Sequence, residues 1–383
     1  MKLLKKIFLV SLIACVSFFI TRCSGVDDRT GRSDPDTDSI EILKPEIPFS
    51  PKHYVCYKTP EPITVDGRIT EGSWEKAPWT DYFVDIEGEL KPKPRLNTRA
   101  KMLWDDKYLY ISAELEEPEI WATLRQRDTV IFYDNDFEVF IDPDGDTHNY
   151  YEFEMNAYGT EWDLMLDKPY RDGGPAISGW DINGMKVGVE IYGTINDPSG
   201  KDEKWTLEIA MPWNILKECA GANYPLKAGD QWRINFSRVE WTTDIVDGRY
   251  VKRKDPGTNK PLSENNWVWS PQGAINMHMP EMWGFLQFSE KYVGEGIDEF
   301  IYNKDEEKKW ALRQLYYLQK TYKNKNGYFA NSLQELGANQ KILNELPGTP
   351  GIWVTKSMFE ISMPGFTEGT TWHINHEGRT WKE

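Results

Sequence analysis

The stretch that most constrains the fold is residues 132–156, where apolar and polar side chains alternate along two short segments. The apolar set is Phe137, Val139, Ile141, Tyr151, Phe153 and Met155, and the polar set is Asp136, Glu138, Asp142, Tyr150, Glu152, Glu154 and Asn156. A period of two residues sends each set to one face of a β-strand. The loop at 143–149 carries Pro, Asp and Gly, which suits a turn between two strands. The stretch therefore predicts a hairpin with one core face and one polar face.

This hairpin brings two carboxylates together. With the turn at 143–149, Glu138 lies directly opposite Glu154, and two carboxylates in such a pair repel each other. The charge must be compensated by an arginine such as Arg233 or Arg238, by a bound cation, or by a shared proton. Our working hypothesis is an arginine that reaches in from the segment 229–240.

Composition narrows the class of partner. The 383 residues carry a net charge of -16, which argues against nucleic acid because phosphate binding needs a basic surface. The chain has 17 Trp and 19 Tyr; we expect most of the tryptophans in a β core, and the surplus fits a surface that stacks on flat ligand faces. No nucleophile elbow, P-loop, HExxH or glycine-rich dinucleotide motif is present.

Seven further segments on either side of the hairpin have the pattern of short strands with turns between them. They are 63–67, 101–115, 186–194, 205–211, 229–240, 267–269 and 283–288. Such a pattern predicts a mainly β fold, an antiparallel β-sandwich of the immunoglobulin-like or jelly-roll type, over residues 54–290. Val239 breaks the alternation near the end of 229–240, which predicts a bulge or a strand end. Residues 168–180 and 244–266 are expected to be loops.

The composition changes after residue 290. Apolar residues recur at helical spacing over 305–324, and Gly327 follows as a stop signal. A short second helix is expected at 332–336, and strands at 358–363 and 371–374. Residues 291–383 are therefore predicted to form a small α+β module, whose role the sequence does not reveal.

The N-terminus resembles an export signal. Lys2, Lys5 and Lys6 precede an apolar run at 7–20, which is short for a membrane span of about 20 residues. We predict a lipoprotein signal peptide over residues 1–22 and a flexible tether over 23–53, which is rich in Asp, Ser, Thr, Gly and Pro.

Cys23 is slightly favoured over Cys15 as the lipidated residue, since it directly precedes the polar tether. The alternative is an ordinary secretory signal. The protein is thus expected at the outer membrane or cell surface, and otherwise in the periplasm or secreted, with a lipid anchor as its one contact with the membrane.

Two cysteines remain in the body of the chain, Cys56 and Cys219. In an oxidising compartment they can form one disulfide, but two free thiols are an equal alternative. Their spacing does not support a zinc cluster.

Six segments, taken in order, resemble the family 9 carbohydrate-binding module found beside xylanases. They are VDGRITEGSW (65–74), MLWDDKYLYISAEL (102–115), DNDFEVFID (134–142), YYEFEMNAYG (150–159), WTLEIAMPW (205–213) and WGFLQF (283–288). The resemblance implies a β-sandwich that binds poly- or oligosaccharide, and possible partnership with glycoside hydrolases.

The resemblance also implies site residues. Family members that bind sugar ends hold the ring between two aromatic side chains and read its hydroxyls with a Glu, an Arg and an Asn. Glu138 and Asn156 match two of these, whereas Glu154 stands in the Arg position. The second clamp position falls near Met277, which is not aromatic. The expected ligand-binding set is Phe132, Tyr133, Glu138, Glu154, Asn156, Arg238, Trp267, Trp269 and His278.

One acidic loop suggests a structural metal. Asp142, Asp144 and Asp146 alternate in DPDGDT, and oxygen-rich loops bind Ca²⁺. The spacing is not that of an EF-hand, so a plain acidic turn is the alternative. No other cofactor is expected.

We expect a non-catalytic carbohydrate-binding protein that supports polysaccharide breakdown. One alternative is a glycoside hydrolase that uses paired carboxylates. A second is a haem-binding sandwich with Met277 and His278 near the iron, although neighbours on one strand cannot both face one metal.

Overall fold

The computed structural model describes residues 42–337 and 346–383. The predicted signal peptide, both lipidation candidates and the tether up to residue 41 lie outside these residues. The rest of the predicted tether, up to residue 53, is not free, because Ile42, Ile47 and Phe49 pack against a buried apolar cluster. The described residues belong to one compact unit. Within this part of the chain no helix combines the length and the apolar character that crossing a bilayer requires.

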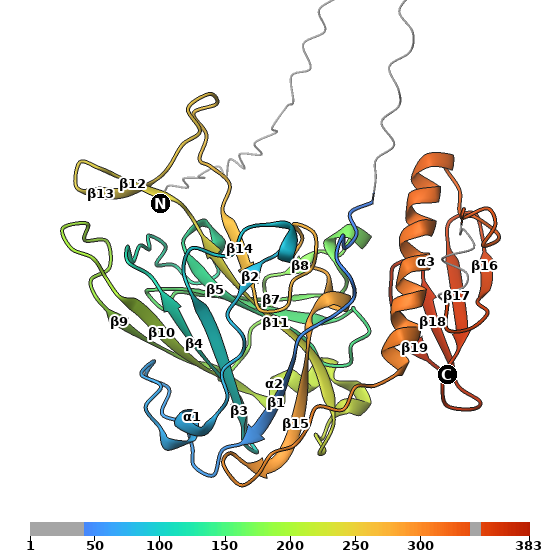
Figure 1. The fold of residues 1–383 in the computed structure, drawn as a ribbon, viewed down its shortest axis with the longest axis horizontal. Coiled ribbons are helices and arrows are strands. Elements are labelled where there is room, and N and C mark those ends of the chain that lie inside the picture. Colours follow the sequence, from blue (N-terminus) through green and yellow to red (C-terminus); the bar gives the residue numbers. More distant parts are fainter. Residues whose placement is uncertain (1–41, 338–345) are drawn as a thin grey trace, which may run out of the picture. The chain divides into compact units, whose positions relative to one another are not determined.

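A β-sandwich forms the larger part of the structure, as predicted (Figure 1). One continuous hydrogen-bonded path runs in the order β8-β7-β6-β5-β11-β15-β1-β3-β4-β10-β9, with β14 and β2 attached to β11. Its pairs are antiparallel except those of β1, which runs parallel to both β15 and β3 and joins the two halves. The strands are β1 (His53–Lys58), β2 (Val84–Asp85), β3 (Thr98–Trp104), β4 (Tyr108–Glu116), β5 (Asp136–Asp142), β6 (Tyr150–Asn156), β7 (Glu161–Leu166), β8 (Ala176–Ile177), β9 (Lys186–Tyr192), β10 (Lys204–Pro212), β11 (Gln231–Glu240), β14 (Asn265–Val268) and β15 (Gly284–Tyr292).

The core lies between the two halves and is built from the alternating apolar residues of each strand. Phe137 and Phe153 from the predicted hairpin meet Ile111 and Ile209 from the other half in one buried cluster. The tryptophans are largely core residues, as expected; those with less than 2% exposure are Trp74, Trp205, Trp232, Trp269 and Trp283. Of the two short helices in this part, α1 (Gly72–Lys76) lies between β1 and β2, and α2 (Trp213–Leu216) directly follows β10.

Three local predictions are wrong. Residues 63–67 form no strand, because the backbone N–H groups of Asp66 and Gly67 donate to the Glu208 carboxylate instead of to a neighbouring strand. Strand β11 continues through Val239 without a bulge, paired in unbroken register with β5. Part of the expected loop at 244–266 is a hairpin of β12 (Thr243–Val246) and β13 (Arg249–Lys252).

The C-terminal part is a long helix on a small sheet, as predicted. Helix α3 (Asp305–Asn326) ends at Gly327, whose φ of 81° is left-handed and favours glycine. The sheet consists of β16 (Gly351–Val354), β17 (Phe359–Pro364), β18 (Thr371–Asn375) and β19 (Thr380–Lys382). The predicted second helix at 332–336 is only a turn.

The helix and its sheet share a core with the sandwich. Leu312 and Tyr316 of α3 pack in one buried cluster with Phe359 of β17 and with Met279 and Met282, which precede β15. This contact places α3 beside the segments that border the polar face of the hairpin.

The two cysteines within the described residues are free. Cys56 is buried and Cys219 is half-buried, and no disulfide joins them. Of the two alternatives left open by the sequence, the structure has the free thiols.

Candidate functional site

The predicted hairpin forms with the predicted register. Strands β5 and β6 pair so that Glu138 lies opposite Glu154 and Asp136 opposite Asn156. The apolar residues of both strands face the core, so the polar residues share the other face. Sequence periodicity alone therefore located this face.

Four carboxyls gather there, and we call them the carboxylate face: Asp136, Glu138, Glu152 and Glu154. Each is at most 5% exposed. Oxygens of Asp136, Glu138 and Glu154 lie within 4.8 Å of one another. One apolar cluster that contains Phe140 and Trp283, and another that contains Val239 and Trp241, flank the face.

Few protein groups hydrogen-bond to these carboxyls. The backbone N–H of Phe132 donates to Glu154 Oε2 at 3.0 Å, and that of Val239 donates to Asp136 Oδ1 at 3.3 Å. Within residues 42–337 and 346–383, Asp136 Oδ2 and Glu138 Oε2 are buried without a hydrogen-bond partner. Buried polar atoms without partners are rare and call for an explanation.

The hypothesis of a compensating arginine is wrong. Arg238 shares its face of β11 with Trp232 and Phe236, the core face, because the strand's period of two continues unbroken. It pairs there with Glu117 at 2.7 Å and with Glu240 at 2.8 Å. The expected ligand-binding role of Arg238 is therefore not supported.

Arg233 is also engaged elsewhere. It lies on the polar side of β11, but its guanidinium pairs with Glu306 of α3 at 2.5 Å and donates to the carbonyl of Trp283. No Lys or Arg ion pair reaches the four carboxyls within the described residues.

Protons are therefore the compensation that the structure supports. Burial raises the pKa of Glu138 to about 7, although the nearby Ser237 hydroxyl opposes this shift. Burial, and then the neighbouring carboxylates, raise the pKa values of Asp136, Glu152 and Glu154 well above their ordinary values. Neutral carboxyls can donate as well as accept hydrogen bonds. A bound cation stays a prediction.

Asn156 is not available to a ligand. Its amide nitrogen donates to the carbonyl of Leu124 and to Asp134, and its amide oxygen accepts from the backbone N–H groups of Tyr158 and Thr160. The side chain is fully buried. Asn156, which matches the sugar-binding asparagine of the family motif, therefore has a structural role in this protein. The expected sugar contact is not supported.

Two of the expected stacking residues belong to the core. Trp267 and Trp269 pack in the apolar cluster between the sheets, so their rings serve the core and the expected stacking role is not supported. Phe132 and Tyr133 do border the face, since the Phe132 N–H bonds to Glu154 and the two rings lie 4.9 Å apart. Tyr133 is half exposed and can offer its ring to a ligand.

His278 lies at the opposite border of the face. Its Nδ1 is 2.9 Å from the Tyr150 hydroxyl, and its Nε2 is 4.0 Å from Glu152. Burial, and then Arg171, lower the pKa of His278 to about 3, so the ring is neutral. Because both nitrogens already face protein groups, the structure gives no support to the haem alternative.

Sequence reasoning missed one side chain at this border. Tyr170, in the loop expected to be merely exposed, packs edge-on against His278 with ring centroids 4.4 Å apart. Nothing in its local sequence marks it, since the loop is placed by distant contacts.

The acidic loop brings its three carboxylates together, again within 4.8 Å. Both oxygens of Asp142 accept backbone N–H groups, and Asp146 pairs with Arg379 at 2.8 Å. Lys309 donates to the carbonyl of Gly145. These donors fit a turn that is held by the protein's own cations better than an open calcium site, so calcium at Asp144 and its neighbours stays a prediction.

A comparison with known protein families identifies the family of this chain. The sequence model of the family described as "Carbohydrate family 9 binding domain-like" matches residues 65–259, about half of the chain. The chain belongs to this family. The match includes the hairpin that carries the carboxylate face.

Two curated relatives of this family 9 protein are enzymes of much greater length. Endo-1,4-beta-xylanase C of Paenibacillus barcinonensis is 33% identical over 121 residues, which are 31% of this chain and 10% of the relative. Exoglucanase XynX of Acetivibrio thermocellus is 37% identical over 194 residues, which are 50% of this chain and 15% of the relative. The chain therefore spans only a small part of either relative.

Solved structures show a distant likeness. A candidate carbohydrate-binding protein from Bacteroides uniformis ATCC 8492 has 17% identity and a TM-score of 0.44, and the match covers 63% of this chain and all of that one. A family 9 carbohydrate-binding module from Caldicellulosiruptor kristjanssonii, solved with glucose, has 14% identity and a TM-score of 0.37, over 64% of this chain and all of that one. Identities this low leave the ligand of this chain open.

Proposed function

We propose that this protein binds carbohydrate without catalysis and so supports polysaccharide breakdown. The observation that carries the proposal is the coincidence of family membership over 65–259 with a polar face of buried carboxyls beside an exposed aromatic ring. Carboxyls form paired hydrogen bonds with sugar hydroxyls, and aromatic rings cover the apolar face of the sugar.

Glu138 and Glu154 are the hydroxyl-binding residues in this proposal. Glu138 has an oxygen without a protein partner, so a ligand hydroxyl that bonds to it would replace no hydrogen bond of the described protein. Glu154 stands where the family resemblance expects an arginine, which can only donate. With a raised pKa, Glu154 carries a proton and can donate too. The same hydrogen bond is then made without a positive charge.

The alternative of a glycoside hydrolase is less well supported. Such enzymes keep one carboxylate ionised beside a protonated one. On the carboxylate face burial raises the pKa of all four groups, including Asp136 and Glu152. Burial thus favours the neutral form of every member of the set, and Glu138 ionises only as the pH rises through about 7.

We further propose that the protein is exported and anchored by a lipid at the outer membrane or cell surface. The support is the sequence pattern of residues 1–22 with Cys23 or Cys15. A tether after such an anchor would present the sandwich to polysaccharide, where glycoside hydrolases are the expected partners.

A glycan array with the folded protein tests the binding proposal. We expect retention of one class of plant or host polysaccharide, and no release of reducing ends from it on incubation. Binding to no glycan would defeat the proposal, and release of reducing ends would favour the hydrolase alternative.

A further inference from the structure

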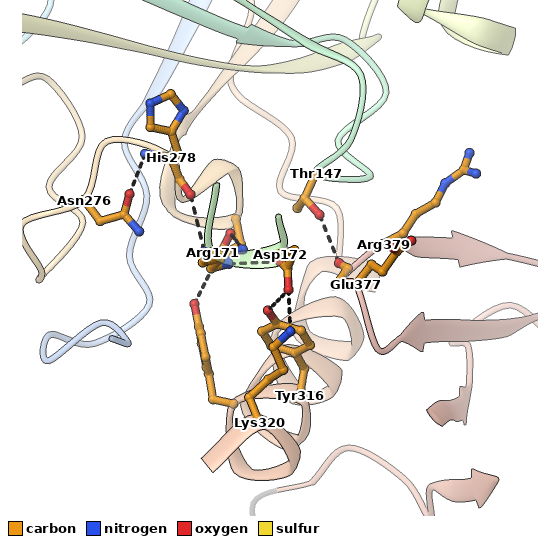
Figure 2. A network of polar contacts seen from close by, with 12 residues as sticks. Thr147, Arg171, Asp172, Asn276, His278, Tyr316, Lys320, Glu377 and Arg379 are labelled. Carbon is orange, nitrogen blue, oxygen red and sulfur yellow. Dashed lines mark hydrogen bonds and ion pairs between the residues drawn. The ribbon is translucent and has the colours of Figure 1, made fainter. Parts of the chain in front are cut away.

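The loop that contains Tyr170 is fastened to the C-terminal helix. Tyr170–Asp172 forms a single 3₁₀ turn between β7 and β8. Figure 2 shows the side chains of Arg171 and Asp172 directed at helix α3, with Tyr316 and Lys320 converging on Asp172. The contact joins two parts of the chain more than 140 residues apart.

Asp172 is the first fastening point. Its Oδ1 accepts from the Tyr316 hydroxyl at 2.5 Å and from Lys320 Nζ at 2.8 Å, and its side chain is fully buried. Lys320 also donates to the carbonyl of His376 in the turn between β18 and β19. Charge-assisted bonds of this kind are strong when buried, so the helix and its sheet hold this side of the loop together.

Arg171 is the second fastening point. It pairs with Glu281 at 2.8 Å, and Glu281 also accepts from the Tyr317 hydroxyl of α3. Burial alone would raise the pKa of Glu281, but Arg171 and then Arg313 outweigh it and lower the pKa to about 2. The pair is therefore ionised at all ordinary pH values, and its charges balance within the interface.

Tyr170 lies between these two fastenings and the carboxylate face. Its ring packs on His278, which in turn lies 4.0 Å from Glu152, and yet it remains 47% exposed. Burial raises the pKa of the Tyr170 hydroxyl to about 12, and the nearby Glu152 and Glu154 add to this shift. The shift agrees with a position of the ring beside those two carboxyls. The exposed ring has no other partner than His278 among the described rings.

The two exposed rings lie toward opposite ends of one pair of carboxyls. Glu152 and Glu154 point to the same side of β6 two residues apart, a separation of about 6.7 Å. Tyr133 follows Phe132, whose backbone N–H bonds to Glu154, and Tyr170 packs on His278, which lies 4.0 Å from Glu152.

We propose that Tyr170 is a ligand-contacting aromatic residue of the carbohydrate site and that the C-terminal helix positions it. The ligand class is a pyranose ring, whose apolar C–H face would lie against the tyrosine. This supplies the second aromatic that is missing at Met277, and it gives the C-terminal module a role. The inference rests on the proposed function.

Tyr170→Ala tests the contact, with Tyr292→Ala as the control, since Tyr292 is 43% exposed and lies at the far end of β15. We expect Tyr170→Ala to weaken binding of the best array glycan roughly three- to tenfold, with the control unchanged. Affinity equal to wild type in Tyr170→Ala, in a protein whose Glu138→Ala variant loses binding, would overturn the proposal.

Lys320→Ala tests the positioning, with the exposed Lys325→Ala on the same helix as its control. We expect faster amide hydrogen exchange at Asp172 and Gly173, affinity lowered about two- to fivefold, and a lowered melting temperature, because the buried Asp172 loses a cation. Lys320→Arg should restore both readouts. Unchanged exchange and affinity in Lys320→Ala would overturn the positioning role.

The experiments distinguish failure of the proposed carbohydrate binding from failure of the Tyr170 contact alone. If the wild-type protein binds no glycan, the proposed function fails and the contact fails with it. Exchange at 168–174 still reports whether α3 holds the loop. If the wild type binds but neither the Tyr170 nor the Lys320 variant differs from its control, only the present inference fails.

Discussion

Glu138 lies in the middle of a sheet face with three other carboxyls and no ion-pair partner among the described cations. A carboxylate in such a place would cost several kcal/mol to keep ionised. Burial instead raises its pKa to about 7, so the side chain changes charge within the physiological range. Stability and ligand binding should therefore depend on pH through this residue.

The sign of the stability effect follows from the shift. The pKa of Glu138 is raised from 4.5 to about 7 on folding, so its stabilising contribution is present below pH 4.5 and is lost as pH rises through 7. We expect Glu138→Gln to remove this loss and to raise the free energy of unfolding at pH 8 by roughly 1–3 kcal/mol. Urea denaturation at pH 5 and pH 8 measures it.

The exposed Glu290 supplies the control, because Glu290→Gln changes the same charge outside the face. A Glu138→Gln variant that is less stable than wild type at pH 8 would show that something other than protons, such as a cation, neutralises the face.

Asn156 should matter for folding rather than for sugar binding. Three of its four hydrogen bonds satisfy part-buried backbone groups of Leu124, Tyr158 and Thr160, and each unsatisfied group costs about 1–3 kcal/mol. Asn156→Ala should lower the free energy of unfolding by roughly 2–4 kcal/mol, as measured by chemical denaturation. A variant of wild-type stability that no longer binds sugar would instead place Asn156 at the ligand.

At the scale of elements, the alternation of apolar and polar residues predicts both the hairpin and the side of β11 on which Arg238 lies. It located the hairpin, its register and its polar face. It also places Arg238 on the core face with Trp232 and Phe236 if β11 continues past Ser237. The expected bulge at Val239 obscured this, because Val239 is apolar on a polar face. Val239 in fact packs with Trp121 and Trp241, a tertiary contact that local pattern cannot reveal.

Arg238 should therefore be essential to the sheet and not to the ligand. It neutralises Glu117 and Glu240, and all three are at most 2% exposed. Arg238→Met would leave the buried Glu117 without a cation and Glu240 with Arg95 alone, and should lower the free energy of unfolding by roughly 3–5 kcal/mol. Thermal and urea unfolding measure this, with the exposed Arg249→Met as control. Lost sugar affinity at full stability would contradict the assignment.

At the scale of the whole molecule, the sequence predicted both parts of the chain but not their contact. The sandwich and the α3 module each follow from local periodicity. The loop at 168–180 looked exposed because Gly and Pro dominate it, yet α3 buries Asp172. Such a contact joins residues that are distant in sequence, so local sequence periodicity cannot predict it. For this reason the expected ligand-binding set included Trp267 and Trp269, which lie in the core, and did not include Tyr170.

The predicted lipid anchor is also a property of the whole molecule. We expect Cys23→Ser to release the full-length chain from the membrane fraction and to abolish labelling by a fatty-acid analogue, because thioether attachment needs the thiol. Cys15→Ser is the matched control and should leave both unchanged. Labelling lost only in Cys15→Ser would move the anchor to that residue, and labelling in neither wild type nor variant would favour an ordinary secretory signal.

The measurement that tests the central claim most directly is titration calorimetry of the folded protein with cello- and xylo-oligosaccharides and with the best glycan from the array. We expect binding at pH 6 that weakens at least tenfold in Glu138→Ala, that weakens in wild type as pH rises to 8, and that is unchanged in Glu290→Ala. A folded wild-type protein that binds none of these glycans, or a Glu138→Ala variant that binds as well as wild type, would contradict it.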